Sequence, residues 1–249
     1  MNGKTIEIQK LVDELPSHLA ERTWLRTSGP PAHEGEFVLY WTHHALRADE
    51  NPALEVALLL AEQLKLPLLV YQGLSEQYRF ASDRHHTFIL EAARDLQAQY
   101  ARLGISYLLH VDRKGARHPR LARLCKSCSI LVTDDFPIES TKQWTERLAQ
   151  SNWCPIVLVD TACVVPSRLV GRAYDRAFAF RSIRTSDAAE ASHAALRGRR
   201  FRTARPNLIA TTSAAPRHSH ATGCARHAGA IISPNARRRL ASHRRHLLN

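Results

Sequence analysis

The apolar residues of this chain fall into short unbroken runs that alternate with longer segments of helical period. The first run, Phe37 to Trp41, is an aromatic and β-branched stretch, short enough for a strand that is buried on both faces as parallel strands are. Further runs of this type follow at residues 67–71, 105–111, 130–133 and 156–160. The pattern therefore predicts five short strands.

The segments between these runs have the apolar spacing of helices that pack on a sheet. Asn51 and Pro52 predict the first helix start, because an Asn side chain caps free backbone N–H groups and Pro at the first helical position loses no hydrogen bond. Later helices are predicted from Ser82 or Asp83 to Leu103, with Phe88, Ala92 and Leu96 on one face, from Pro119, and over 139–150. Five strands that alternate with helices predict a parallel, doubly wound, Rossmann-like α/β sheet.

Polar residues follow the predicted strands at their carboxyl ends, which is where ligands bind in doubly wound sheets. Thr42, His43 and His44 either line such a pocket or form a solvated turn. Two adjacent His residues lack a third ligand, so no metal site is predicted. Arg47 is expected to pair with a carboxylate of the same turn. The other polar residues at strand ends are Gln72, Gly73, Asp112, Thr133, Asp134, Asp135 and Asp160, and for the acidic ones we expect capping and turn hydrogen bonds.

Several classes of protein lose their usual support. The sequence contains no GxGxxG, GxxxxGK[ST], GxSxG or HExxH motif. It has no apolar run of membrane-spanning length, and its first thirty residues lack the apolar segment of a secretory signal, so we expect a cytoplasmic location. The five cysteines are odd in number, which agrees with a reducing compartment. Cys125 and Cys128 form a lone CxxC, and we expect ordinary buried thiols there.

Composition divides the chain near Ser186. Residues 187–249 hold twelve Arg, no Lys and two acidic residues, which accounts for +10 of the formal net charge of +12. This part also holds fifteen Ala and has no apolar period, so we expect it to be largely disordered. A frameshift near codon 186 would explain the abrupt change. The alternative is a genuine basic arm that contacts nucleic acid without sequence preference.

The residues around the first helix start resemble a known family. Trp41, Leu46-Arg47 and Asn51-Pro52 look like the W-x-x-x-x-L-R-x-x-D-N-P-A-L signature of photolyases and cryptochromes, with Glu50 in place of the usual Asp. The lead-in from Gly35 is most similar to class II photolyases. Weaker matches follow in the same order at Arg84-His85, Phe88, Leu90-Glu91, Val132-Thr133-Asp134, Trp144, Val159-Asp160 and Val165-Pro166.

The resemblance covers residues 35 to 184 and implies an N-terminal antenna domain. It implies a strand order of 3-2-1-4-5 and a pocket for a folate or deazaflavin type of antenna chromophore. The family usually has F-R-R-D where this chain has Thr42-His43-His44-Ala45. The residues implied to line the pocket are Thr42, His43, His44, Gln72, Gly73, Asp112, Thr133 and Asp134.

The resemblance also implies a division of the chain. Residues 1–36 are predicted to be a helical extension, 37–170 the α/β domain, 171–186 a linker toward a flavin domain, and 187–249 the tail. In the family a larger helical domain binds FAD and takes up the flipped-out lesion of the DNA. We find no such domain after Ser186, so we expect a truncated deoxyribodipyrimidine photolyase-like protein that has no catalytic residues and does not repair DNA alone. The alternative is a stand-alone α/β ligand-binding module with a tail that tethers it to nucleic acid.

Overall fold

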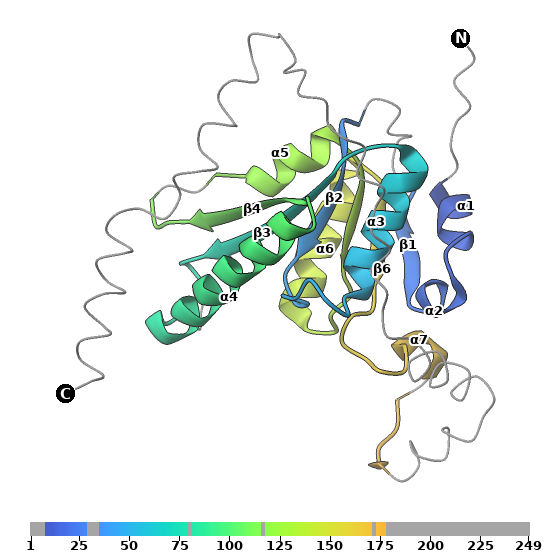
Figure 1. The fold of residues 1–249 in the computed structure, drawn as a ribbon. Coiled ribbons are helices and arrows are strands. Elements are labelled where there is room, and N and C mark those ends of the chain that lie inside the picture. The colour runs from blue at the N-terminus through green and yellow to red at the C-terminus, as the bar shows by residue number, and fades with distance from the viewer. Residues whose placement is uncertain (1–7, 29–34, 79–80, 116–117, 171–172, 178–249) are drawn as a thin grey trace, which may run out of the picture. The chain divides into compact units, whose positions relative to one another are not determined.

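The computed structural model describes residues 8–28, 35–78, 81–115, 118–170 and 173–177 (Figure 1). They form one mostly parallel sheet of six strands, in the order β1-β6-β5-β2-β3-β4. The strands are β1 (Thr23–Thr27), β2 (Phe37–Thr42), β3 (Leu68–Ser75), β4 (Ser106–Asp112), β5 (Cys128–Asp134) and β6 (Ile156–Val159). The helices are α1 (Ile8–Asp13), α2 (Ser17–Ala20), α3 (Pro52–Leu64), α4 (Asp83–Arg102), α5 (Arg120–Ser127), α6 (Glu139–Ser151) and α7 (Ser167–Val170).

The predicted fold class is confirmed. The five predicted strands are β2 to β6; they pair in parallel, and their order β4-β3-β2-β5-β6 is the predicted 3-2-1-4-5. The β2 register pairs Trp41 with Tyr71 on one side and with Thr133 on the other. All carboxyl ends of these strands therefore meet at one edge of the sheet.

The prediction of five strands was wrong by one, and the prediction of a helical extension over residues 1–36 was incomplete. Helices α1 and α2 do form there, but Thr23–Thr27 is a strand that pairs antiparallel with β6, with Trp24 opposite Leu158. Its sequence, TWLRT, is rich in β-branched and aromatic residues, which favour strands. The free edge of β6 decides the outcome, because pairing satisfies its backbone groups.

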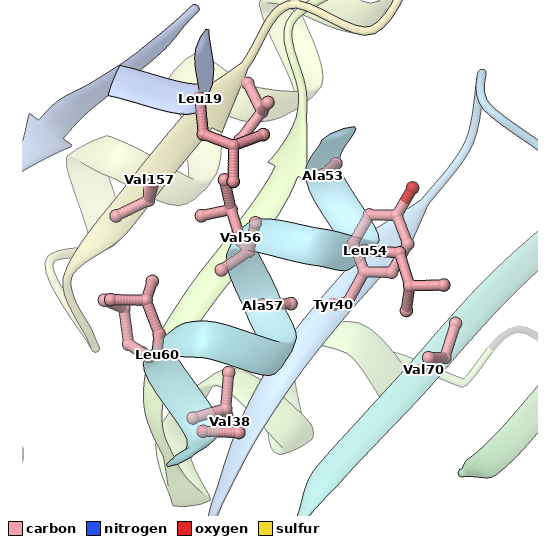
Figure 2. Close-up of a cluster of buried hydrophobic side chains, with 14 of the residues drawn as sticks. Leu19, Val38, Tyr40, Ala53, Leu54, Val56, Ala57, Leu60, Val70 and Val157 are labelled. Carbon is pink, nitrogen blue, oxygen red and sulfur yellow. The ribbon is translucent and has the colours of Figure 1, made fainter. Parts of the chain in front are cut away.

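Apolar side chains form a layer on each face of the sheet. On one face, α1, α2, α3 and α4 contribute to a cluster that includes Tyr40 and Val70 (Figures 1 and 2). Figure 2 shows α3 laid against β2, with its small Ala53 and Ala57 turned toward the sheet. On the other face, α5 and α6 cover a second cluster around Trp41, Tyr71 and three cysteines.

Helix α4 is buried along a different stripe from the predicted one. Its buried residues are Ala93, Leu96 and Tyr100, whereas Phe88 is 70% exposed. The prediction was right for Leu96 and wrong for Phe88, because only the second half of the helix lies over the sheet core.

Predictions for the end of the chain fall largely outside the described residues. These include the whole predicted tail, 187–249, and residues 178–186 of the predicted linker. A separate unit over residues 208–249 also lies outside them. Within the described part, no helix is both long and apolar enough to cross a membrane.

Candidate ligand site at the carboxyl edge of the sheet

The turn after β2 is held by a carboxylate from β5. Asp134 is 1% exposed, and its Oδ2 accepts hydrogen bonds from the backbone N–H groups of His43 (3.0 Å) and His44 (3.1 Å). Its Oδ1 accepts a longer bond of 3.3 Å from the Tyr40 hydroxyl. The neighbouring Thr133 hydroxyl donates to the carbonyl of Trp41 at 2.8 Å. These two residues therefore fix the backbone of the turn rather than face a ligand.

Asn51 organises the same turn from its other end. Its Oδ1 accepts from the backbone N–H groups of Ala53 and Leu54, both at 3.1 Å, which confirms the predicted N-cap with Pro52 as the first helical residue. Its Nδ2 donates to the Tyr40 hydroxyl and to the carbonyls of Ala45 and Arg47. A buried amide with this many partners determines the shape of the turn.

Arg47 does not pair with a carboxylate, as we had predicted. Its Nε donates to the carbonyl of Glu50 at 3.0 Å, and its Nη2 donates to the carbonyl of Thr161 at 3.4 Å. Glu50 has a positive φ of 49°, so its carbonyl is turned toward the guanidinium fork. The residue still has the structural role we expected, because it ties the turn to the segment that follows β6.

His43 differs from its neighbours, because its side chain has nothing to bind. Both ring nitrogens are buried and have no hydrogen-bond partner within the described structure. The ring lies 4.9 Å from the Trp41 ring, centroid to centroid, in a tilted arrangement. Burial lowers the pKa of His43 below its usual range, although the nearby Asp134 opposes the shift. The imidazole is therefore neutral at pH 7 and carries one free donor and one free acceptor.

The other two members of the predicted turn are already engaged. The Thr42 hydroxyl donates to the carbonyl of Ala45 at 3.3 Å. The His44 ring stacks on Phe136, with centroids 3.7 Å apart and planes 17° apart. Neither residue presents an unused polar group comparable with that of His43.

The ends of β3 and β4 form a second polar group of residues. The Tyr107 hydroxyl donates to Oε1 of the buried Gln72. The Tyr71 hydroxyl lies 3.2 Å from Nδ1 of His110, whose Nε2 lies 3.6 Å from Oδ1 of Asp112. Burial raises the pKa of both tyrosines, so both remain protonated. We had not identified Tyr71, Tyr107 or His110 from the sequence, although their alternation with Gln72 and Asp112 was a usable signal.

Gly73 belongs to this second group for a steric reason. A Cβ atom at this position would lie 3.2 Å from the Tyr71 hydroxyl oxygen and 3.4 Å from a ring carbon. The missing side chain lets the Tyr71 ring lean over the strand toward His110.

The predicted pocket is thus divided between two groups of residues. Thr42, His43, His44, Thr133 and Asp134 meet at the ends of β2 and β5, whereas Gln72, Gly73 and Asp112 lie at the ends of β3 and β4. No group of three or more His, Cys, Asp or Glu side chains suited to a metal ion occurs among the described residues. The divided arrangement offers hydrogen bonds and stacking rather than acid–base catalysis.

A cavity of about 270 Å³ lies beside the first group, between β1, the end of β5 and the first turns of α6. Of the predicted residues only Asp134 lines it. Its rim holds an ion pair in which Arg26 Nη2 donates to both carboxylate oxygens of Glu146 at 2.7 and 2.5 Å. Burial, followed by the charge of Asp160, raises the pKa of Asp135 in its wall. This cavity was missed because it depends on β1, which the sequence analysis had assigned to a helix.

Beyond β6, Asp160 and Arg22 hold the next loop. The Asp160 carboxylate accepts from the backbone N–H groups of Ala162, Cys163 and Ser167, which agrees with the predicted turn and capping role. The buried Arg22 donates to the carbonyls of His18, Asp160, Cys163 and Val164. Arg22 was missed because its partners lie about 140 residues away in sequence.

Comparison with known proteins gives one family. A model of the family described as DNA photolyase matches residues 38–196. A deoxyribodipyrimidine photo-lyase from Methanothermobacter thermautotrophicus is 29% identical over 147 residues, which is 59% of this chain and 32% of that protein. The matched part therefore spans about a third of that relative's length.

Solved structures give weaker likenesses. A universal stress protein family member from Burkholderia pseudomallei has a TM-score of 0.33 at 20% identity, covering 50% of this chain and 96% of that one. A universal stress protein from Archaeoglobus fulgidus has a TM-score of 0.36 at 12% identity, covering 50% and 98%. Scores this low carry no conclusion about function.

Proposed function

The chain belongs to the DNA photolyase family, and on that premise we propose that residues 37–170 form the antenna-chromophore-type α/β domain of a light-dependent deoxyribodipyrimidine photolyase. The scaffolding roles of the signature residues support this proposal. Trp41 and Asn51 are buried, Pro52 begins α3, Leu46 packs on the core, and Arg47 binds backbone carbonyls. The family signature is therefore used to build the turn and leaves ligand contact to other side chains.

The observation that carries the proposal is the unpartnered imidazole of His43. A buried polar group without a hydrogen bond costs about 1–3 kcal/mol, so such groups are rare unless a ligand or water meets them. His43 lies at the edge where ligands bind in this class of fold and contacts the Trp41 ring. A planar chromophore with hydrogen-bonding groups on its ring would satisfy the imidazole and stack in the same place.

The residues of the domain would bind and orient such a chromophore rather than react with it. A folate or deazaflavin antenna absorbs light and passes on the excitation energy when it is bound. His43 would contribute one donor and one acceptor, while Asp134 keeps the backbone of residues 43 and 44 fixed by its two hydrogen bonds. Asp134 is thus a positioning residue for His43.

We place the FAD chemistry of the family outside this domain. The cavity of about 270 Å³ next to Asp134 is smaller than the pockets of about 300–1,000 Å³ that usually hold ligands of drug size. We therefore expect no light-dependent repair by the α/β domain itself. A flavin absorption spectrum in a one-to-one ratio with the purified chain would overturn this part of the proposal.

The antenna site is tested by titrating the purified chain with a reduced folate and with a deazaflavin, and following chromophore fluorescence. His43→Leu removes both ring nitrogens at similar volume and should weaken binding by about tenfold or more, the equivalent of about 1.4 kcal/mol. His118→Leu changes an exposed histidine and is the matched control. Unchanged affinity in His43→Leu would remove His43 from the site, and failure of both chromophores to bind would reject the antenna role.

The stand-alone module with a tethering tail is the second candidate, supported by the +10 charge of residues 187–249. Tail-driven binding would be insensitive to DNA lesions, and its logarithmic affinity would fall steeply with the logarithm of salt concentration. Preference for damaged over undamaged DNA by the whole chain would argue against this candidate.

A further inference from the structure

Three cysteines gather at the edge of the sheet opposite the ligand site. Cys125 lies in the last turn of α5, Cys128 begins β5, and Cys154 comes two residues before β6. They are 2%, 3% and 2% exposed and belong to the apolar cluster beneath α5 and α6. The sequence showed the CxxC pair, but only the fold adds Cys154 to it.

The thiols contact one another as well as the core. The Sγ of Cys128 donates to the carbonyl of Cys125 at 3.6 Å. The thiols of Cys125 and Cys128 both hydrogen-bond to the sulfur of Cys154, and these bonds hold the pKa of Cys154 below its usual range despite burial. The same contacts raise the pKa of Cys128, because it acts as a donor. The arrangement therefore concentrates thiolate character on one sulfur with two thiols beside it.

This arrangement differs from an ordinary set of buried thiols. Buried cysteines in apolar surroundings are normally inert, because burial raises their pKa and suppresses the thiolate. A metal site does not explain the cluster, since no suitable group of ligands was found among the described residues. What remains is sulfur redox chemistry, for which a thiolate next to a second thiol is the required pair.

We propose that Cys125, Cys128 and Cys154 form a peroxide-oxidisable dithiol site, in which the Cys154 sulfur is oxidised first and a CxxC thiol resolves it to a disulfide. The oxidant is a hydroperoxide, of which hydrogen peroxide is the smallest. The Cys154 thiolate attacks one peroxide oxygen, the O–O bond breaks, and hydroxide leaves as water after protonation. The Cys125 or Cys128 sulfur then attacks the Cys154 sulfenic acid, forming an S–S bond and releasing a second water. Two thiols are oxidised by two electrons, and one hydrogen peroxide is reduced to two waters.

Cys163 provides the matched comparison within the same chain. It is a half-buried and more accessible thiol after β6, and burial followed by Asp160 raises its pKa. If access alone governed oxidation, Cys163 would react before the three buried cysteines. The proposal predicts the opposite order.

The experiment treats the reduced full chain with a small excess of hydrogen peroxide, alkylates the remaining thiols and digests with trypsin. Cleavage after Lys126 places Cys125 and Cys128 on separate peptides, whereas Cys154 and Cys163 share one peptide over 148–168, so the Cys163→Ser chain is analysed as well. We expect a disulfide between the Cys154 peptide and one CxxC peptide in both proteins. Cys163 should remain alkylated in the chain that retains it.

The rate of peroxide-dependent thiol loss completes the test. Cys154→Ser should slow the oxidation of Cys125 and Cys128 by about tenfold or more, because the thiolate is the reacting form. Cys163→Ser should leave their oxidation unchanged. Equal rates in Cys154→Ser and the unsubstituted chain, or oxidation confined to Cys163, would overturn the proposal. Disulfide mapping of the unsubstituted chain decides the matter even if Cys154→Ser folds poorly.

Discussion

The strand ends of β2 and β5 and those of β3 and β4 both carry polar side chains, but the two groups do different work. At β2 and β5, Asp134 is 1% exposed and accepts bonds from two backbone N–H groups of the turn. At β3 and β4, the Asp112 side chain is 24% exposed and lies beside His110, at a strand end that needs no such clasp. The difference comes from the turn, because a tight connection buries backbone groups that require partners.

The comparison shows how to recognise a candidate ligand contact. A polar residue at a strand end is scaffold when its hydrogen bonds are consumed by the backbone, as with Asp134 and Asn51. It is a candidate contact when it is buried and its polar atoms remain unused, as with His43. Neighbours in the sequence can therefore have opposite roles.

The largest expected effect tests this contrast directly. Asp134→Ala should lower the free energy of unfolding by about 3–4 kcal/mol, because it leaves two buried N–H groups without an acceptor. Asp112→Ala should cost under about 1 kcal/mol, since its side chain is partly solvated. Urea unfolding of the two variants measures both values. Equal losses would abolish the distinction between the two groups.

Asn51→Ala should have the next largest effect. It removes the cap of α3 together with three donated hydrogen bonds, and we expect a loss of about 2–3 kcal/mol. Asn51→Asp keeps the capping oxygen but loses the donated bonds, so its loss isolates the second contribution. A cost for Asn51→Asp close to zero, measured by urea unfolding at pH 7, would show that the cap alone matters.

The pH dependence of stability should report on His43. Its folded pKa is lowered, chiefly by burial, with Asp134 opposing and His44 adding to the shift. As pH falls below about 6.5, the unfolded chain takes up a proton that the folded chain does not, so stability decreases by up to about 1.4 kcal/mol per pH unit for this group. The decrease ends below the folded pKa. His43→Leu should flatten the slope between about pH 6.5 and 5, and an unchanged slope in thermal or urea unfolding would contradict the shift.

Tyr71→Phe is expected to have the smallest effect. It removes the hydroxyl that lies 3.2 Å from His110 and should cost about 1 kcal/mol. Tyr107→Phe is the control at the same edge, because it removes the corresponding bond to Gln72. In the comparison of the two groups, both losses should stay below that of Asn51→Ala. A larger loss in Tyr71→Phe would indicate that the Tyr71, His110 and Asp112 set holds the edge of the sheet.

Sequence reasoning was most successful where the signal is local. The runs that became β2 to β6 and the cap at Asn51 and Pro52 were predicted because apolar period, β-branching and capping chemistry act over a few residues. The site was predicted as a set of strand ends, and those residues do lie at one edge. Their individual roles were not predicted, since the partners of Asp134 lie about 90 residues away.

The sequence alone determined the α/β layering and the family, since the signature from Trp41 to Pro52 is a local pattern that the fold requires. Tertiary structure decided the pairing of β1 with β6, the clasp of Asp134, the unpartnered imidazole of His43 and the joining of Cys154 to the CxxC pair. Each of these depends on which distant segments the sheet register brings side by side. That register is set by the packing of whole strands and helices, which no short stretch of sequence contains.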